Sequence, residues 1–412
     1  MKVLVLGGTG RIGKPTSERV AKLAAVTRVT VAGRNRSEGA RVASQIGSKA
    51  TSAPVDLFDH DRLVSLASQN DLVVNTAGPD YKVADRVVRA AVDAGVHCID
   101  ISADPRATER ILALDEKARA SGLTIITGIG HSPGISNLMM MHAARQLDEV
   151  EEVHFDVNCP VSLFLSGDPG QMAAEFRKSG SVNASWETLF KWIAGPVRIL
   201  FDGRLAEIDP AGSPREVNVP TGGITSVYPL GTTEPVTMPS HLRGIRSLSS
   251  RLAWFPPQLN VPYVTLGRQI RDGELDTAEA TISFLDLIAA NPRRWLTGPP
   301  GAPSRFINWA TAMGWKGGRQ ATYTCWPLGD WMSTVGTLFL AVSRFVNGDF
   351  RERGVFPPEG AFEAAPFLRE VARDAGGIAS RRKWLAERLD ARPGRPRRGA
   401  QSRTGPRRAR TR

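Results

Sequence analysis

The feature that most constrains this sequence is a glycine-rich turn that directly follows an apolar stretch at its start. Gly8-Thr9-Gly10-Arg11-Ile12-Gly13 matches G-x-G-x-x-G and lies between the strand-like KVLVL and a helical pattern over residues 12–24. In this context the glycines let the backbone approach a pyrophosphate, and the helix N-terminus attracts its charge. The alternative is a tight turn with only a structural role. We expect Gly8–Gly13 to bind a dinucleotide.

The end of the second expected strand indicates which dinucleotide binds. NAD-selective sites place an acid about 20 residues past the glycines, where it holds the ribose hydroxyls. This chain instead reads Gly33-Arg34-Asn35-Arg36-Ser37. A guanidinium matches a 2′-phosphate and can stack on adenine. Arg34 and Arg36 therefore predict NADP(H), although two solvated surface arginines would give the same pattern.

The chain alternates apolar strand patterns with helical ones over its first third. Continuous apolar strands separated by helices are typical of a parallel sheet covered on both faces. We therefore expect an α/β protein with a Rossmann, doubly wound parallel sheet and a second, mixed α/β domain whose sheet is largely antiparallel. We expect a helix over 135–147, a strand near 279–286 and helices over 333–346 and 367–374. The expected units are a Rossmann NADP-binding domain (1–134), a substrate or dimerisation domain (135–345), a C-terminal helical segment (346–390) and a disordered arginine-rich tail (391–412).

The strongly basic composition comes from the end of the chain. The net charge is +12, but residues 392–412 hold nine arginines and no acid, which leaves +3 on the rest. Such a stretch has almost nothing apolar to bury. It is either a solvated extension, the reading we favour, or a nucleic-acid-binding arm. The three cysteines are far apart and no apolar run reaches membrane length, so we expect a cytoplasmic protein without metal or membrane contact.

The glycine turn also suits short-chain dehydrogenases, which need a Tyr-x-x-x-Lys motif. None of the four tyrosines, Tyr81, Tyr228, Tyr263 and Tyr323, has a lysine four positions on. That catalytic apparatus is absent.

Four further segments carry a resemblance to a known family. NTAGPDYKVADRVVRAAVDAGVHCIDIS (75–102), GIGHSPGISNLMM (128–140) and the later SVYPLGTTEPVTMP and GVFPPEGAF resemble segments of the saccharopine dehydrogenase-like oxidoreductases. The resemblance covers most of residues 1–375. It implies a Rossmann domain joined to a substrate domain, a nicotinamide cofactor, commonly a dimer, and oxidation or reduction of a C–N bond in an amino-acid-derived small molecule.

The resemblance also suggests roles for particular residues. The loop Asn75-Thr76-Ala77-Gly78-Pro79 should pass near the cofactor ribose and nicotinamide. Asp56 should lie near the adenine, and Asp100 and Ser102 at the mouth of the cleft. Two departures border the expected pocket: Cys98 stands where the family prefers tyrosine, and Asp80-Tyr81 replaces the usual phenylalanine.

Hydride transfer to an imine can require a proton donor and a group that stabilises positive charge. We expect Asp100, which ends a strand at the carboxyl edge of the sheet, and His131, in the loop before Pro133, to fill these roles. Tyr81 and Cys98 are weaker candidates, and Asp100 and His131 also suit structural roles. Arg243, Arg246 and Arg251 could bind a carboxylate or form a solvated face. The alternatives to C–N chemistry are an enoyl or carbonyl reductase with a lipid-like substrate and a non-catalytic NADP-binding regulator.

Overall fold

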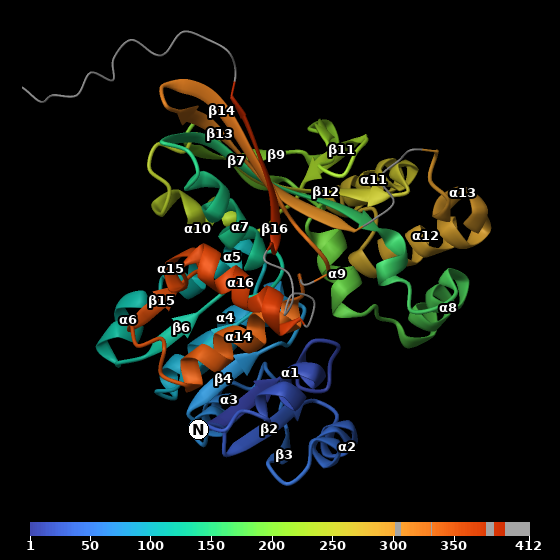
Figure 1. The fold of residues 1–412 in the computed structure, drawn as a ribbon. Helices are drawn as coiled ribbons and strands as arrows, with labels where there is room; N and C mark the ends of the chain where they lie inside the picture. The colour runs from blue at the N-terminus through green and yellow to red at the C-terminus, as the bar shows by residue number, and fades with distance from the viewer. Residues whose placement is uncertain (301–305, 331, 376–382, 392–412) are drawn as a thin grey trace, which may run out of the picture.

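The computed structural model describes residues 1–300, 306–330, 332–375 and 383–391. It contains two sheets, with the first one low and the second one high in the view of Figure 1. The expected arginine-rich tail, residues 392–412, lies outside the described residues.

The first sheet has seven strands in the order β15-β6-β5-β4-β1-β2-β3, and every neighbouring pair is parallel. Its strands are β1 (Lys2–Leu6), β2 (Arg28–Gly33), β3 (Ala50–Pro54), β4 (Leu72–Asn75), β5 (His97–Asp100), β6 (Thr124–Ile126) and β15 (Gly354–Phe356). Its helices are α1 (Gly13–Val20), α2 (Arg36–Ile46), α3 (His60–Ala67), α4 (Asp80–Asp93), α5 (Pro105–Leu112), α6 (Asp115–Ala120) and α14 (Thr334–Val346). This confirms the predicted doubly wound sheet.

Alternate side chains of β1 enter two different cores, as a sheet with helices on both faces requires. Val3 and Val5 pack with α1, α2 and α14, whereas Leu4 and Leu6 pack with α3, α4, α5 and α6. The carboxyl ends of β1, β4 and β5 therefore meet at one edge of the sheet, between the two helical layers.

The second sheet has nine strands, and every pair except β12 with β7 is antiparallel. Its strands are β7 (Glu149–Pro160), β8 (Val197–Phe201), β9 (Arg204–Ile208), β10 (Arg215–Asn218), β11 (Ile224–Pro229), β12 (Ser247–Phe255), β13 (Ile307–Lys316), β14 (Arg319–Pro327) and β16 (Leu385–Ala391). The helices are α7 (Ile135–Ala144), α8 (Pro169–Ser179), α9 (Ala184–Lys191), α10 (Glu234–Thr237), α11 (Asn260–Arg271), α12 (Thr277–Ala290), α13 (Pro292–Leu296), α15 (Pro358–Ala361) and α16 (Ala364–Asp374). Short 3-10 turns lie at Val161–Phe164, Pro210–Gly212, Met238–Ser240 and Pro257–Leu259.

The strand expected near residues 279–286 is wrong, because this segment lies in helix α12. Asp276 caps the helix and accepts bonds from the backbone of Ala278 and Glu279, while the Glu279 side chain bonds back to the Asp276 N–H. This capping box begins a helix whose buried Ala280, Phe284 and Ile288 share one face at i, i+4 and i+8 spacing.

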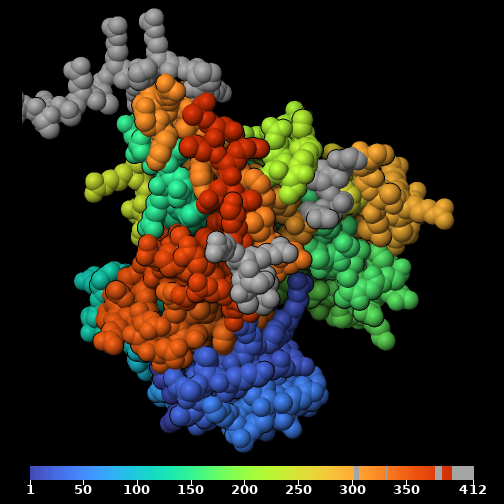
Figure 2. Space-filling model, in the orientation of Figure 1, coloured from blue at the N-terminus to red at the C-terminus, as the bar shows by residue number. Residues whose placement is uncertain are grey.

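The stretch 346–390 was expected to be a helical segment, and the structure shows strands in it as well. β15 pairs with β6 at the edge of the first sheet, and β16, which runs on to Ala391, pairs with β14 at the edge of the second. We call the seven-stranded sheet with its helices the first unit and the nine-stranded sheet with its helices the second unit. Figure 2 shows the orange and red C-terminal segments extending over both units on this face of the molecule.

Candidate active site at the carboxyl edge of the first sheet

The glycine turn between β1 and α1 is closed by its own backbone. Gly10 N–H donates to the Gly7 carbonyl at 2.9 Å, and Gly7 has a φ of +73°, which favours glycine. A Cβ on Gly7 would lie 2.8 Å from the Ala77 backbone, and one on Gly13 would lie 2.1 Å from the Gly7 oxygen. The turn therefore has room for backbone only. This cradle at the N-terminus of α1 fits a dinucleotide pyrophosphate.

Arg34 and Arg36 follow β2 and are both exposed. Within the part of the chain that the structure describes, no carboxylate lies within 4 Å of either guanidinium. Asn35, between them, caps α2 by accepting from Glu38 N–H at 3.0 Å. The cap fixes the chain direction while both guanidinium groups stay free, as binding of a 2′-phosphate requires.

The loop after β4 lies beside the glycine turn. Thr76 donates from both N–H and Oγ1 to the Leu6 carbonyl, at 2.9 and 2.7 Å. A Cβ on Gly78 would lie 2.9 Å from the Cβ of Ala184, at the start of α9. The second unit therefore packs directly over this loop. Asp56, expected near the adenine, is exposed and accepts from Phe58 N–H at 3.0 Å.

Asp100 is completely buried, and both of its carboxyl oxygens are occupied. It accepts from Asn75 Nδ2 at 2.7 Å, from Ser102 N–H at 2.8 Å and from Thr127 Oγ1 at 3.0 Å. Burial raises the pKa of Asp100, and these bonds oppose the shift. The carboxyl group thus ties the ends of β4, β5 and β6 together.

His131 packs between two aromatic rings, with centroids 6.0 Å from Phe155 and 5.8 Å from Phe306. Burial lowers its pKa to about 4. Its Nε2 is enclosed and has no hydrogen-bond partner among the described residues. The imidazole is therefore neutral near pH 7, which does not favour the proton transfer expected of it there.

The loop that carries His131 is anchored by a buried polar cluster. Ser132 Oγ and Ser136 Oγ both donate to Glu234 Oε1, the first at 2.7 Å. Asn137 Nδ2 donates to Glu359 Oε2 at 2.8 Å. Burial raises the pKa of Glu359 to about 7. These contacts join α7, α10 and α15, so the GTTEP and PPEG segments singled out in the sequence meet at one point.

A cavity of about 180 Å³ lies between the carboxyl edge of the first sheet and the second unit. Asp80, Asp104 and Arg106 line one wall, and Lys191 and Trp192 contribute to the other. The cavity therefore presents both acids and bases. Its full lining is Asp80, Asp104, Pro105, Arg106, Thr188, Lys191, Trp192, Ala194, Gly195, Pro196, Val197, Arg198, Glu207 and Gly231.

Asp80 is the most perturbed acid of this cavity. It accepts from Ala103 N–H at 2.7 Å and from Tyr81 N–H at 3.0 Å. Burial raises its pKa to about 6, with Asp104 adding to the shift and the two backbone bonds opposing it. A carboxyl group with this pKa can hold a proton close to neutral pH.

Side chains from both units meet beside the cavity. Tyr81 Oη donates to Glu187 at 2.6 Å, and Lys82 Nζ pairs with the same carboxylate at 2.9 Å. Arg198, on β8, forms an ion pair with Glu109 on α5. Arg11, in the glycine turn, lies 5.8 Å from the centre of the Phe164 ring. These contacts hold the second unit against the carboxyl edge of the first sheet.

Most residues that line the cavity belong to no motif that the sequence shows. Asp80 was noted only as a departure from a family pattern, and Arg106 and Lys191 carried no motif. Asp104 precedes Pro105 and caps α5 by accepting from Ala107 N–H at 2.7 Å, a signal that was readable as a helix start. Arg251, considered as a carboxylate binder, is instead buried in an ion pair with Asp156 at 2.7 Å.

The sequence predicts neither a metal site nor a membrane-spanning helix. Among the described residues, no group of three or more His, Cys, Asp or Glu side chains is placed to hold a metal ion. No helix in the described ranges combines the length and apolar character needed to cross a membrane.

Comparisons with known proteins agree with this geometry. A model of the saccharopine dehydrogenase NADP-binding domain matches residues 3–126. A Mycobacterium tuberculosis protein named as a trans-acting enoyl reductase is 29% identical over 175 residues, covering 41% of each chain. The human saccharopine dehydrogenase-like oxidoreductase is 28% identical over 162 residues, covering 35% of this chain and 38% of that protein. These matches thus span about two fifths of the length of the curated relatives.

A solved structure extends the likeness to the whole fold. Apo saccharopine dehydrogenase (L-Glu forming) from Saccharomyces cerevisiae superposes with a TM-score of 0.61, covering 95% of this chain and all of that one at 16% identity. At that identity the match shows the fold alone. The domain match confirms the predicted NADP(H) cofactor. Residues 3–126 are thus a saccharopine dehydrogenase-type NADP(H)-binding domain, and the chain is similar to the saccharopine dehydrogenase-like oxidoreductases.

Proposed function

We propose that this protein transfers a hydride between NADP(H) and a C–N bond of an amino-acid-derived substrate held in the cavity between the two units. The observation that carries the proposal is the mixed charge of this cavity at the carboxyl edge of the sheet. Arg106 and Lys191 suit a substrate carboxylate, and Asp80 and Asp104 suit an ammonium or iminium group.

In the direction of reduction, NADPH bound at the glycine turn would supply a hydride to the imine carbon, and the nitrogen would gain a proton to give the amine. Asp80 holds a proton at its carboxyl group and, once ionised, faces the positive charge on nitrogen. Asp100 acts indirectly in this proposal, by fixing the loop that begins at Asn75.

A second candidate is reduction of an enoyl or carbonyl group on a lipid-like substrate. It is supported by the name of the mycobacterial relative and by an aromatic cluster next to the glycine turn. Phe164, which faces Arg11, lies 5.8 Å from the ring of Trp186 and 5.6 Å from the ring of Trp254. Both indoles are almost completely buried.

The decisive experiment measures NADPH oxidation with pairs of 2-oxo acids and amines and, separately, with enones. Asp80→Asn should lower kcat with the imine-forming pairs and remove the limb of the pH profile near pH 6, with the NADPH Kd unchanged. Lys191→Met should raise the KM for the 2-oxo acid about tenfold, the loss of one charge-assisted bond.

Lys178→Met, which removes an exposed lysine of α8 outside the cavity, is the matched control. Full turnover of the imine-forming pairs by Asp80→Asn would reject the role given to the cavity. Reduction of enones alone would replace C–N chemistry with the second candidate. Tight NADPH binding with no turnover of either class would favour a non-catalytic regulator.

A further inference from the structure

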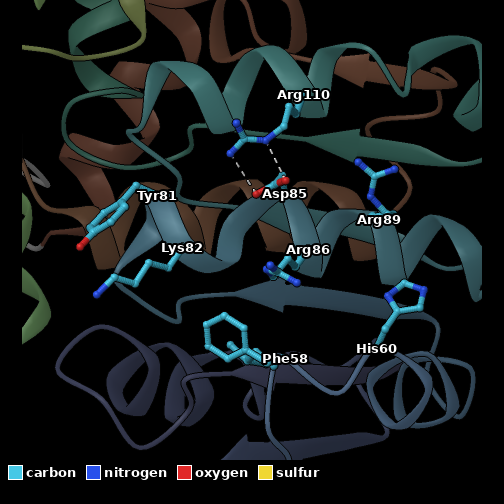
Figure 3. Close-up of a pocket in the computed structure, with 9 residues that line it drawn as sticks. Phe58, His60, Tyr81, Lys82, Asp85, Arg86, Arg89 and Arg110 are labelled. Carbon is cyan, nitrogen blue, oxygen red and sulfur yellow. Dashed lines mark hydrogen bonds and ion pairs between the residues drawn. The ribbon is translucent and has the colours of Figure 1, made fainter.

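A second hollow with a different lining lies on the outer side of α4, and Figure 3 shows the residues that form it. This α4 groove encloses about 660 Å³. The loop between β3 and α3 forms one wall, and α4 and the end of α5 form the rest. Its lining residues are Leu57, Phe58, His60, Tyr81, Lys82, Asp85, Arg86, Arg89 and Arg110. Its volume is that of a typical small-molecule site.

The α4 groove carries an excess of positive charge. Lys82, Arg86 and Arg89 are spaced i, i+4 and i+7, so they share one face of α4, and Arg110 faces them from α5. Asp85 is the one acid of the lining. Like charges along one helix face cost stability, so this spacing is not explained by the needs of the helix.

Three of the basic side chains in the lining have carboxylate partners. Arg110 pairs with Asp85 at 2.8 Å, Lys82 with Glu187 at 2.9 Å, and His60 with Asp93 at 3.0 Å.

Arg86 and Arg89 differ from these three. Among the residues that the structure describes, no carboxylate lies within 4 Å of either guanidinium, and both side chains are exposed. The two arginines thus remain available to an anion from outside the protein.

An aromatic ring lies beside these arginines. Phe58 is 58% exposed, unusual for so large an apolar side chain, and the Arg86 guanidinium lies 5.1 Å from the centre of its ring. A flat ligand ring can stack on an exposed phenyl group, and the adjacent guanidinium can bind a phosphate attached to that ring.

From this juxtaposition we propose that the α4 groove is a second ligand site, which takes a phosphate-bearing ligand with an aromatic ring, of the nucleotide class. Arg86 and Arg89 bind the phosphates, and Phe58 stacks on the ring. The site is distinct from the expected NADP(H) site, because its lining contains none of the residues expected to hold that cofactor: Gly8–Gly13, Arg34, Arg36, Asp56 and Thr76–Pro79. A small ligand is favoured over a protein partner because the charge and the ring converge within one hollow.

The test titrates ADP, pyrophosphate and adenosine into the full-length protein saturated with NADPH, by calorimetry at low salt. We expect ADP to bind more tightly than pyrophosphate, and adenosine at least tenfold more weakly than ADP. Arg86→Ala and Arg89→Ala should each weaken ADP about tenfold, and Phe58→Ala should weaken ADP but not pyrophosphate. Phe58→Tyr should restore ADP binding, and added salt should weaken it.

Arg62→Ala, which removes an exposed arginine of α3 outside the groove, should leave ADP binding unchanged. Melting temperatures of the ligand-free variants show whether each is folded. The proposal is overturned if ADP does not bind, if it binds Arg86→Ala and Arg89→Ala as well as the unmodified protein, or if it displaces NADPH. Equal affinity for ADP and pyrophosphate would show that the ligand ring contributes nothing to binding, and would so overturn the assigned ligand class.

Discussion

Replacing Gly13 by alanine would place a Cβ 2.1 Å from the Gly7 carbonyl oxygen and 2.5 Å from Thr76 Oγ1. Real Cβ atoms essentially never approach a neighbour within 3.0 Å, so the Gly7 carbonyl must move by about 0.9 Å. That oxygen accepts from Gly10 N–H, so the movement opens the turn that is expected to hold the pyrophosphate.

Forcing a methyl group into a packed site costs about 1–3 kcal/mol. Without cofactor the turn can relax, so much of that cost falls on binding, which must restore the closed turn. At about 1.4 kcal/mol per factor of ten, Gly13→Ala should weaken NADPH between about 5-fold and 150-fold. Fluorescence titration of NADPH, with circular dichroism to check folding, measures both effects.

Gly39→Ala provides the matched control. Gly39 lies inside α2, and its added Cβ would lie 3.4 Å from the Ser52 Cβ, an ordinary contact. The change should stabilise the protein by up to about 1 kcal/mol, because alanine favours helix, and leave the NADPH Kd unchanged. An unchanged NADPH Kd in a folded Gly13→Ala protein would refute the steric argument for the turn.

Two further changes test the binding of the 2′-phosphate and the buried cluster. Arg34→Ala combined with Arg36→Ala should weaken NADPH binding by more than about 100-fold and leave NADH unchanged, since two lost charge-assisted bonds of about 1.5–3 kcal/mol each sum to about 3–6 kcal/mol. Equal losses for both cofactors would contradict a 2′-phosphate contact. Because burial raises the pKa of Glu359 from 4.5 to about 7, the native state binds the extra proton, so stability falls as the pH rises from about 4.5 to 7. Glu359→Gln should flatten that fall by up to about 3 kcal/mol in urea unfolding curves, whereas Glu363→Gln, at an exposed position, should not.

Features that depend only on residues close together in the sequence were predictable from it. The glycine turn, the apolar strands of the first sheet and the NADP-binding domain follow from local patterns, and the structure and the domain match confirm them. The prediction of a strand over 279–286 was wrong because apolar residues in this segment are not confined to the buried face of the helix. Asp276 and Glu279 have the spacing of a capping box, which indicates a helix start.

The cavity could not be predicted in this way, because the residues that line it are far apart in the sequence. Lys191 and Asp80 are 111 positions apart and become neighbours only when α9 packs on the loop at Gly78. A local pattern also could not show that Asn75 and Thr127 fill the oxygens of Asp100, because burial and hydrogen bonding arise from the assembled sheet.

The position of β15 has a consequence for how the chain can fold and be divided. The first sheet is completed by residues 354–356, more than 220 positions after β6, so that edge stays unpaired until almost the entire second unit has been synthesised. An open parallel edge invites pairing with other chains. An isolated fragment of residues 1–134 should therefore aggregate, whereas one that also supplies residues 334–375 through a linker regains both the edge strand and α14, the helix against α1. Although the nucleotide-binding unit is synthesised first, its sheet is among the last parts of the structure to be completed.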